Sequence, residues 1–341
     1  MPMMSRKPRL KRLRDQTIVI TGASSGIGLA TARMAAARGA RVMLTSRNEP
    51  DLRRVTQEIC AKGGRAAFAV ADVADPDAMD AVARAATREF GGLDTWVNNA
   101  GVSIFGKLTE VPLEDKRRLF ETNFWGVVHG CRSAVNHLRH GGGAIINIGS
   151  IVSDRAVPLQ GIYSASKHAV QGYTDVLRME LEHEGIPIAV SLVKPSAIDT
   201  PYLEHARNYM TAAPNFPPPV YDPDLVAQAI LRCAERPTRE ITVGGGGRMM
   251  AAIGMVAPRT MDRYMETTMF RQQRDFTRPP DNTDSLYAPS RDGLAHGPYS
   301  GHVMKSTPYT TAMMSDVTRV LPFIAAGVAL AAGVRRWKNA A

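Results

Sequence analysis

The sequence predicts an α/β fold with a doubly wound parallel sheet, helices on both of its faces and a C-terminal extension. Three observations predict it. Short apolar runs alternate with amphipathic stretches between residues 15 and 244. The runs are apolar throughout, as is typical of strands buried on both faces. The first run leads directly into a glycine-rich turn at residues 21–28, where a crossover helix is expected to begin.

Seven strands and six helices are expected in alternation. The strands are expected at residues 17–21, 41–45, 66–70, 95–98, 144–148, 188–193 and 241–243. The helices are expected at residues 26–38, 51–62, 76–89, 113–139, 161–184 and 224–236. Strand–helix–strand units pair in parallel with right-handed crossovers, so the pattern predicts a seven-stranded Rossmann-like sheet.

The alternation ends near residue 244, and the rest of the chain divides into three segments. Residues 245–275 are Met-rich and are expected to be helical on either side of Pro258. Residues 276–315 are rich in Pro, Gly, Ser, Thr and Asp, which predicts an extended linker. Residues 316–341 contain an apolar run at 320–334, and a cationic end follows it.

The net charge of +10 lies at the two ends of the chain. Residues 1–14 carry six Lys or Arg and no acid, whereas residues 15–244 carry 24 basic and 25 acidic side chains. A near-neutral body argues against a nucleic-acid partner, because such domains usually carry a basic face. The basic N-terminal tail, residues 1–14, is expected to be solvated; attraction to an anionic membrane or to nucleic acid is the alternative.

The three cysteines and the histidines indicate neither disulfides nor a metal site. Cys60, Cys131 and Cys233 are far apart and show no CxxC spacing, which favours reduced thiols in the cytoplasm. His137 and His140 lack an obvious third ligand, so no metal is expected. The basic start leads into the first strand rather than into an apolar signal region.

Residues 320–338 are a candidate membrane contact. The fifteen-residue apolar run would extend about 22 Å as a helix, which is short of the ~30 Å hydrocarbon core. A shallow or tilted insertion is expected instead, with the cationic cluster at the headgroups. The cluster comprises Arg335, Arg336, Trp337 and Lys338. Docking on protein, and disorder, are the alternatives.

The turn at residues 21–28 and the end of the second strand both indicate a nucleotide site. The turn reads TGASSGIG; its glycines let the backbone approach a pyrophosphate, and the helix that follows offers N–H groups to it. Ser46-Arg47 ends the second strand, where an acid would repel a 2′-phosphate. The Arg47 guanidinium suits that phosphate, which favours NADP(H) over NAD(H). The alternative is that Arg47 is an ordinary surface arginine.

Tyr163 and Lys167 form a candidate catalytic pair. They are four residues apart, hence on one face of a helix. An ammonium beside a phenol favours the phenolate and lowers the tyrosine pKa, which suits proton transfer near neutral pH. A YxxxK match alone is common by chance.

Several motifs together resemble one family. In order and spacing, the sequence resembles the TGxxxGxG branch of the short-chain dehydrogenases/reductases over about residues 15–244. The matching motifs are TGASSGIG, Asp72-Val73, NNAG at 98–101, Asn123, Ser150, YSASK at 163–167 and KPSAIDTP at 194–201.

The resemblance implies an oxidoreductase that transfers hydride between NADP(H) and a carbonyl or secondary alcohol. Tyr163 would transfer the proton, Ser150 would polarise the carbonyl, Lys167 would bind the nicotinamide ribose, and Asn123 would hold a relay water. The implied cofactor-binding residues are Gly22, Ser24, Ser25, Gly26, Ile27, Gly28, Ser46, Arg47, Asp72, Val73, Asn99, Ala100, Gly101, Tyr163, Lys167, Pro195, Ile198 and Thr200.

Individual roles follow from the same resemblance. Asp72 would bind the adenine amino group and Asn99 the adenosine ribose. The sequence departs from the family's pattern at Ser196, where glycine is usual, and at Ser25, where NADP-preferring members often carry a basic residue. The cofactor preference therefore depends on Arg47 and on the missing acid.

Substrate and assembly are less determined. Aromatic and Met residues after Thr200 favour an apolar substrate such as a lipid, a steroid or a hydrophobic ketone; the alternative is that they only pack on the core. Resemblance implies a homodimer or homotetramer through the helices near 113–139 and 161–184. The rival function is a catalytically idle NADP-binding scaffold or regulator recruited to a membrane or partner. An epimerase is disfavoured by the TGxxxGxG spacing.

Overall fold

A computed structural model describes residues 8–280, 283–290 and 293–315. Its centre is a seven-stranded sheet in the order β3-β2-β1-β4-β6-β7-β11, and every neighbouring pair is parallel. The strands are β1 Thr17–Thr21, β2 Arg41–Ser46, β3 Arg65–Val70, β4 Thr95–Asn98, β6 Gly143–Ile148, β7 Ile188–Pro195 and β11 Glu240–Val243. The predicted doubly wound sheet is confirmed.

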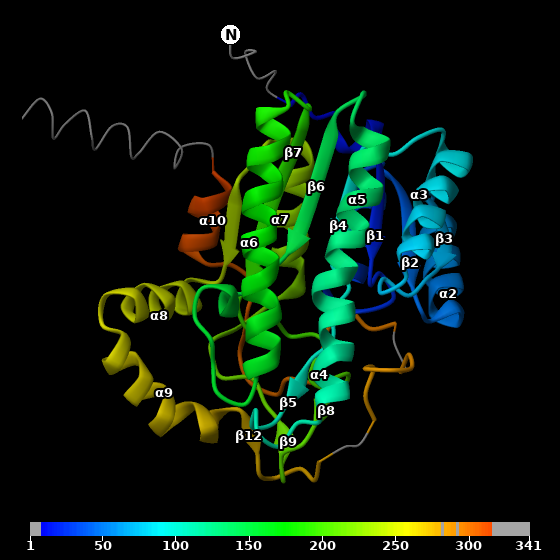
Figure 1. Ribbon diagram of the computed structural model, residues 1–341. Helices are drawn as coiled ribbons and strands as arrows, with labels where there is room; N and C mark the ends of the chain where they lie inside the picture. The colour runs from blue at the N-terminus through cyan, green and yellow to red at the C-terminus, as the bar shows by residue number, and fades with distance from the viewer. Residues whose placement is uncertain (1–7, 281–282, 291–292, 316–341) are drawn as a thin grey trace, which may run out of the picture.

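Helices cover both faces of this sheet (Figure 1). On one face lie α1 Gly26–Ala37, α2 Glu49–Ala61 and α7 Pro223–Glu235. On the other lie α3 Pro76–Phe90, α5 Gly126–Leu138 and α6 Gly161–His183. The chain winds outward in both directions from β1 and β4, so their carboxyl ends border the crevice where such sheets bind ligands.

The stretch expected as one helix at 113–139 is continuous but not uniform. Helix α4 Leu113–Phe120 leads into a π-helical turn, Glu121–Trp125, which leads into α5. Wider turns of this kind often occur at functional sites. The turn contains the predicted catalytic residue Asn123.

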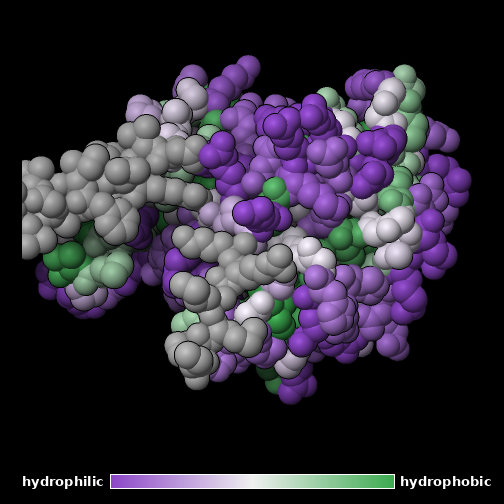
Figure 2. All heavy atoms as spheres, turned by 90° about the horizontal axis from the view of Figure 1, so that it is seen from above, coloured by the Kyte–Doolittle hydropathy of each residue, from purple (hydrophilic) through white to green (hydrophobic). Residues whose placement is uncertain are grey.

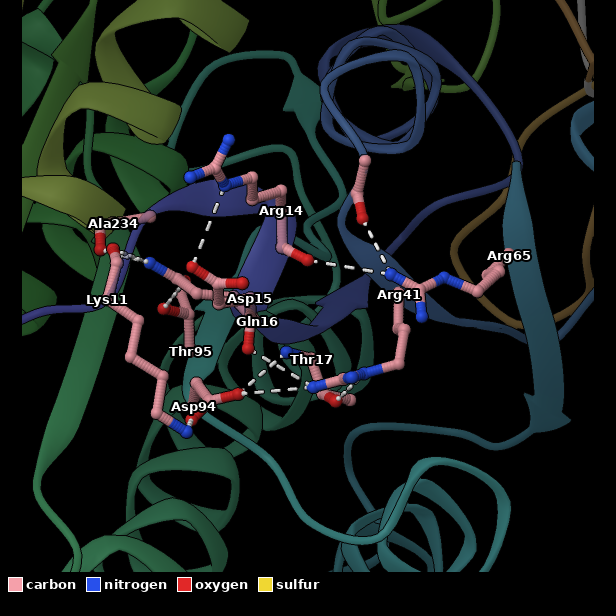
Figure 3. A network of polar contacts seen from close by, with 11 residues as sticks. Lys11, Arg14, Asp15, Gln16, Thr17, Arg41, Arg65, Asp94, Thr95 and Ala234 are labelled. Carbon is pink, nitrogen blue, oxygen red and sulfur yellow. Dashed lines mark hydrogen bonds and ion pairs between the residues drawn. The ribbon is translucent and has the colours of Figure 1, made fainter. Parts of the chain in front are cut away.

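A polar network fastens the start of the chain to the sheet edge opposite the crevice (Figure 3). Lys11 Nζ lies 2.6 Å from Asp94 Oδ1, and Gln16 Nε2 donates to the Ala234 carbonyl at 2.7 Å. The nearby Leu13 side chain is buried. Of the basic tail expected at 1–14, residues 1–7 lie outside the described residues. In residues 8–14 Leu13 packs on the body, whereas the side chains of Arg9, Lys11, Arg12 and Arg14 are exposed.

The C-terminal extension folds back on the domain that contains the seven-stranded sheet. Helices α8 Gly245–Val256 and α9 Pro258–Gln272 flank Pro258, as the sequence predicts. They are followed by β12 Arg274–Asp275, β13 Val303–Met304 and α10 Pro308–Met314, where β12 pairs with β9 Ala213–Pro214 and β13 with β10 Val220–Tyr221. A further short pair joins β5 Ile104–Phe105 to β8 Arg207–Asn208.

The prediction of an extended linker at 276–315 needs correction. This segment has little regular structure, but it packs closely on the body, with the Leu286, Ala295 and Thr310 side chains buried. Composition indicated the irregular backbone but not the tertiary contacts of these few side chains. The apolar run at 320–334 and the cationic end lie outside the described residues.

The surface seen from above in Figure 2 is largely hydrophilic, and hydrophobic residues gather at its left, on the side where Figure 1 shows α8 and α9. The exposed apolar side chains of α8 are Met249, Ile253, Met255 and Val256. Within the described ranges, no helix combines the length and hydropathy needed to cross a bilayer.

Candidate active site

The glycine-rich turn between β1 and α1 forms a cradle that excludes side chains. Gly22 has a φ of +65°, and a Cβ there would lie 2.9 Å from the Ala100 Cα. A Cβ on Gly28 would lie 2.1 Å from the Gly22 carbonyl oxygen. The backbone can therefore turn tightly and bring the N-terminus of α1 to the crevice, a geometry that fits a dinucleotide pyrophosphate.

This cradle opens into a cavity of about 800 Å³ that continues from Arg47 to Tyr163. The structure brings together along its walls all of the predicted cofactor-binding residues except Gly28, which packs behind the turn. Ser150 also lines it. Residues from six of the seven matching motifs, all but Asn123, thus meet in one space.

At one end of the cavity, several predicted polar residues are already engaged by the protein. Asp72 pairs with Arg118 and accepts from the Ala74 N–H at 3.0 Å. Burial opposes ionisation of Asp72, but these two contacts outweigh it and lower the carboxyl pKa. The Asn99 side chain donates to the Thr21 and Gly22 carbonyls at 2.9 and 3.1 Å, so it holds the glycine turn.

Arg47 lies at the carboxyl end of β2, as the sequence predicts. Its guanidinium donates to the backbone carbonyls of Ser285, Leu286 and Tyr287 in the C-terminal extension. The Ser46 hydroxyl accepts from the Asn48 N–H at 3.1 Å. The sequence offered no signal for the contacts between Arg47 and a segment about 240 residues later.

At the other end, Ser150, Tyr163 and Lys167 come together. Tyr163 and Lys167 share one face of α6, with Lys167 Nζ 5.7 Å from the centroid of the tyrosine ring. Lys167 Nζ also donates to the Ile148 carbonyl at 2.8 Å. Ser150 caps the short helix at Ile151–Ser153 and hydrogen-bonds to Tyr163.

Burial controls the ionisation of this pair. It raises the pKa of Tyr163, although hydrogen bonds with Tyr202 and Ser150 partly offset it. It also lowers the pKa of Lys167 to about 8. The expectation that the ammonium depresses the tyrosine pKa is not met in the protein by itself, because desolvation of the Tyr163 hydroxyl outweighs its hydrogen bonds with Tyr202 and Ser150.

Asn123 is buried in the π-helical turn, and the backbone of Val102 satisfies its side chain. Asn123 Oδ1 accepts from the Val102 N–H at 2.8 Å, and Nδ2 donates to the Val102 carbonyl at 2.9 Å and to Ser166 Oγ at 3.2 Å. Asn123 does not line the cavity. Its side chain therefore fixes the turn after β4 against α6.

Tyr202 is a site residue whose importance the sequence did not reveal. Its ring meets Tyr163 edge-on at 5.7 Å between centroids and stacks on Phe216 at 6.0 Å. Its hydroxyl lies 2.8 Å from Ser103 Oγ and 3.1 Å from Gln160 Oε1. The sequence distinguishes Tyr202 only as one of several aromatic residues after Thr200.

The extension supplies one wall of the cavity near Tyr163. Gln160 donates to Gln273 at 2.6 Å, across 113 residues of sequence. Methionines of α8 and α9 also line this wall: Met249, Met250, Met261 and Met269. No local motif marks these residues, since their placement depends on how the extension folds back.

Ser196, which stands where the family usually has glycine, contacts the start of the C-terminal extension. The Ser196 N–H donates to the Val243 carbonyl at 2.9 Å, and its hydroxyl lies 3.2 Å from the Gly244 carbonyl. Pro195, Ile198 and Thr200 still line the cavity. A serine is therefore accommodated here without closing the site.

The described part of the chain contains no group of three or more His, Cys, Asp or Glu side chains placed to hold a metal ion. Cys60, Cys131 and Cys233 form no disulfide bond.

Known proteins share both the sequence and this architecture. The short chain dehydrogenase profile matches residues 16–210. The uncharacterized oxidoreductase YxnA of Bacillus subtilis (strain 168) is 42% identical over 344 residues, covering 99% of this chain and 94% of that protein. The 3beta-hydroxysteroid dehydrogenase 1 of Eggerthella lenta is 37% identical over 192 residues, covering 55% of this chain and 73% of that protein.

A solved structure agrees with the fold. The alcohol dehydrogenase from the archaeon Thermococcus sibiricus, complexed with 5-hydroxy-NADP, superposes with a TM-score of 0.59 and 25% sequence identity. The match covers 67% of this chain and 95% of that one.

Proposed function

This chain belongs to the short-chain dehydrogenase family of oxidoreductases, and we propose that it uses NADP(H) to interconvert an apolar carbonyl compound and its secondary alcohol. The observation that carries the proposal is the meeting of Ser150, Tyr163 and Lys167 in the same cavity as the glycine-rich turn and Arg47.

The residues at the Tyr163 end suit proton transfer to a carbonyl oxygen. The bound cofactor would supply hydride to the carbonyl carbon. The Ser150 and Tyr163 hydroxyls would donate hydrogen bonds to the oxygen as it gains charge, and Tyr163 would give it a proton. Lys167, held by the Ile148 carbonyl, would hold the ribose next to the nicotinamide.

Asn123 contributes differently from its expected role. Since its amide is used by Val102 and Ser166, a relay water behind Lys167 would be held by the Asn123 main-chain carbonyl rather than by its side chain.

Arg47 supports NADP(H) as the cofactor. It lies at the end of β2 and lines the cavity beside the glycine-rich turn, where a 2′-phosphate would bind. Asp72, the nearest acid of the motif set, is paired with Arg118, which offsets its charge. The solved relative's 5-hydroxy-NADP is consistent with this choice.

The substrate wall supports an apolar substrate. Tyr202, Phe216 and the methionines of α8 and α9 surround the approach to Tyr163. The side-chain amides of Gln160 and Gln273 hydrogen-bond to one another, and Gln273 also donates to the Pro158 carbonyl. These polar groups are therefore already satisfied by the protein on this side of the cavity. The hydroxysteroid dehydrogenase of E. lenta provides a precedent for such a substrate.

The test is a screen of apolar ketones and secondary alcohols with the full chain, followed by NADPH absorbance. The proposal predicts turnover of at least one compound. Tight NADPH binding without turnover of any compound would favour the rival function, a cofactor-binding scaffold.

The proposals on assembly and on localisation each depend on a single kind of observation. A homodimer or homotetramer through the helical stretch 113–139 and α6 is supported by the exposed Trp125, Val176 and Met179. Cytoplasmic placement with membrane contact through residues 320–338 is supported by the sequence alone. Fractionation of the full chain and of a truncation after Ser315 tests the contact; equal recovery of both in the soluble fraction at low salt would refute it.

A further inference from the structure

Part of the C-terminal extension runs along the carboxyl edge of the sheet, across the cofactor end of the cavity. We name residues 283–290 and 293–297 the strap; in Figure 1 it belongs to the orange segment at the lower edge of the sheet, on the side of α2. The short chain dehydrogenase profile ends at residue 210, well before the strap begins.

The first half of the strap is anchored by a buried side chain and a charged cluster. Leu286 is fully buried among Val102, Ile104, Val111 and Leu119. Asp284 lies 2.9 Å from Arg207 Nε, and the Tyr287 hydroxyl donates to Asp115 at 2.7 Å. The Arg207 guanidinium also lies over the Tyr287 ring and pairs with Asp115.

The second half is anchored at the glycine-rich turn. The Gly293 N–H donates to the Ser24 carbonyl, and the Gly26 N–H donates to the Leu294 carbonyl, both at 2.9 Å. A Cβ at Gly297 would lie 2.5 Å from the Thr200 carbonyl oxygen, so the strap passes tightly over the end of the cavity. The strap thereby accepts from the first N–H of α1, whereas the N–H groups of Ile27 and Gly28 have no carbonyl four residues earlier within the helix.

Between these anchors, the strap forms a wall of the cavity and restrains Arg47. Ser285 and Pro289 face the same cavity as Ser46, Asp72 and the glycine-rich turn. Three strap carbonyls accept from the Arg47 guanidinium, and the Leu286 carbonyl also accepts from Arg118 at 3.1 Å. Because the cavity lies between the strap and the motif residues, the strap borders the space rather than filling it.

We infer that the strap is a component of the cofactor site, which encloses the adenosine end of the dinucleotide and positions Arg47 beside the 2′-phosphate. The inference rests on the proposed use of NADP(H). The strap carbonyls fix one edge of the planar Arg47 guanidinium. An arginine restrained in this way loses less conformational freedom on binding a phosphate than an unrestrained arginine does.

Hydrogen exchange of the full chain tests enclosure without any substitution. NADPH should slow exchange of the strap N–H groups, including those of Ser285 and Gly293, which are bonded to the His205 and Ser24 carbonyls. A strap that obstructs the site would have to leave it, and its exchange would then accelerate. Acceleration or no change on adding NADPH would overturn the inference.

Asp284→Asn tests the positioning of Arg47. It weakens the anchor at Arg207 without altering a residue assigned to the cofactor or to catalysis. We expect a dissociation constant for NADPH about three- to tenfold higher, as is typical for the loss of a hydrogen bond, and a smaller change for NADH. Asp275→Asn is the matched control, since it breaks an Asp–Arg pair with Arg278 in the same extension but outside the strap.

The outcomes separate this inference from the proposed function. If wild-type protein prefers NADPH and loses that preference in Arg47→Ala, but Asp284→Asn binds NADPH as the wild type does, the positioning role is wrong and the cofactor choice stands. If the wild type binds NADH and NADPH equally, the cofactor choice is wrong, and the role of the strap in reading the phosphate is wrong with it.

Discussion

At the scale of single residues, the enclosed Lys167 gives the site a pH dependence. Burial lowers its pKa to about 8, so it is charged below that pH and neutral above it. Because the charged form is assigned to ribose binding, kcat/KM for NADPH should be level below pH 8 and fall by about tenfold per pH unit above it. A steady-state pH profile with NADPH as the varied substrate measures this.

Lys167→Arg provides the control for this profile. Arginine stays charged throughout the range, so the alkaline limb should disappear even if the overall rate is lower. If kcat/KM for NADPH still falls above about pH 8 in this variant, the titrating group is not Lys167.

The proposed preference for NADP(H) depends on Arg47. Arg47→Ala should raise the dissociation constant of NADPH by about 10- to 100-fold, because a charged hydrogen bond to phosphate is worth about 1.5–3 kcal/mol. NADH binding should change little. Calorimetric titration measures both, with Arg53→Ala as a control, since Arg53 lies on the exposed side of α2 and pairs with Glu49. An equal loss of both affinities would contradict a role in phosphate recognition.

At the scale of elements, the helices of the extension determine the substrate wall. Met249 lines the cavity and is 64% exposed, so Met249→Gln should leave the fold intact. We expect KM for an apolar ketone to rise by roughly three- to tenfold, with NADPH affinity unchanged, because a polar amide replaces an apolar contact. Met255→Gln is the matched control: Met255 is 75% exposed on the same helix and does not line the cavity. Equal effects of both substitutions would contradict a substrate-facing role for Met249.

Elements determined by local patterns could be predicted, and those that depend on distant contacts could not. The strands and Gly22, Tyr163 and Lys167 follow from apolar runs and from motif spacing, which act over a few residues. Leu286 lies in a segment without periodicity, and Gln273 ends a helix whose packing position no local pattern indicates. The partners of both residues are more than a hundred residues away. The direction of the Tyr163 pKa shift was also missed, because burial is a tertiary property.

At the scale of the whole molecule, the proposed assembly can be tested at the exposed side chains of α6. Val176 and Met179 lie three residues apart, hence on one face of the helix, and about half of each side chain is exposed. Replacing both with Glu should shift a dimer or tetramer toward monomer at micromolar concentration, because a buried interface tolerates unpaired charge poorly.

Light scattering of this double variant and of Val70→Glu measures the shift. Val70 is similarly exposed but belongs to β3, at the edge of the sheet. Wild-type protein that is already monomeric would contradict the proposed assembly, as would an assembly that both variants leave intact.

The most direct test of the central claim compares wild-type protein with Tyr163→Phe on a ketone that the wild type reduces. The substitution keeps the ring and its edge-on packing against Tyr202, but it removes the proton donor together with the hydrogen bonds of the hydroxyl. NADPH should bind with unchanged affinity, and the rate of NADPH oxidation should fall by about 10²- to 10⁴-fold. Near-native oxidation by Tyr163→Phe would contradict the account.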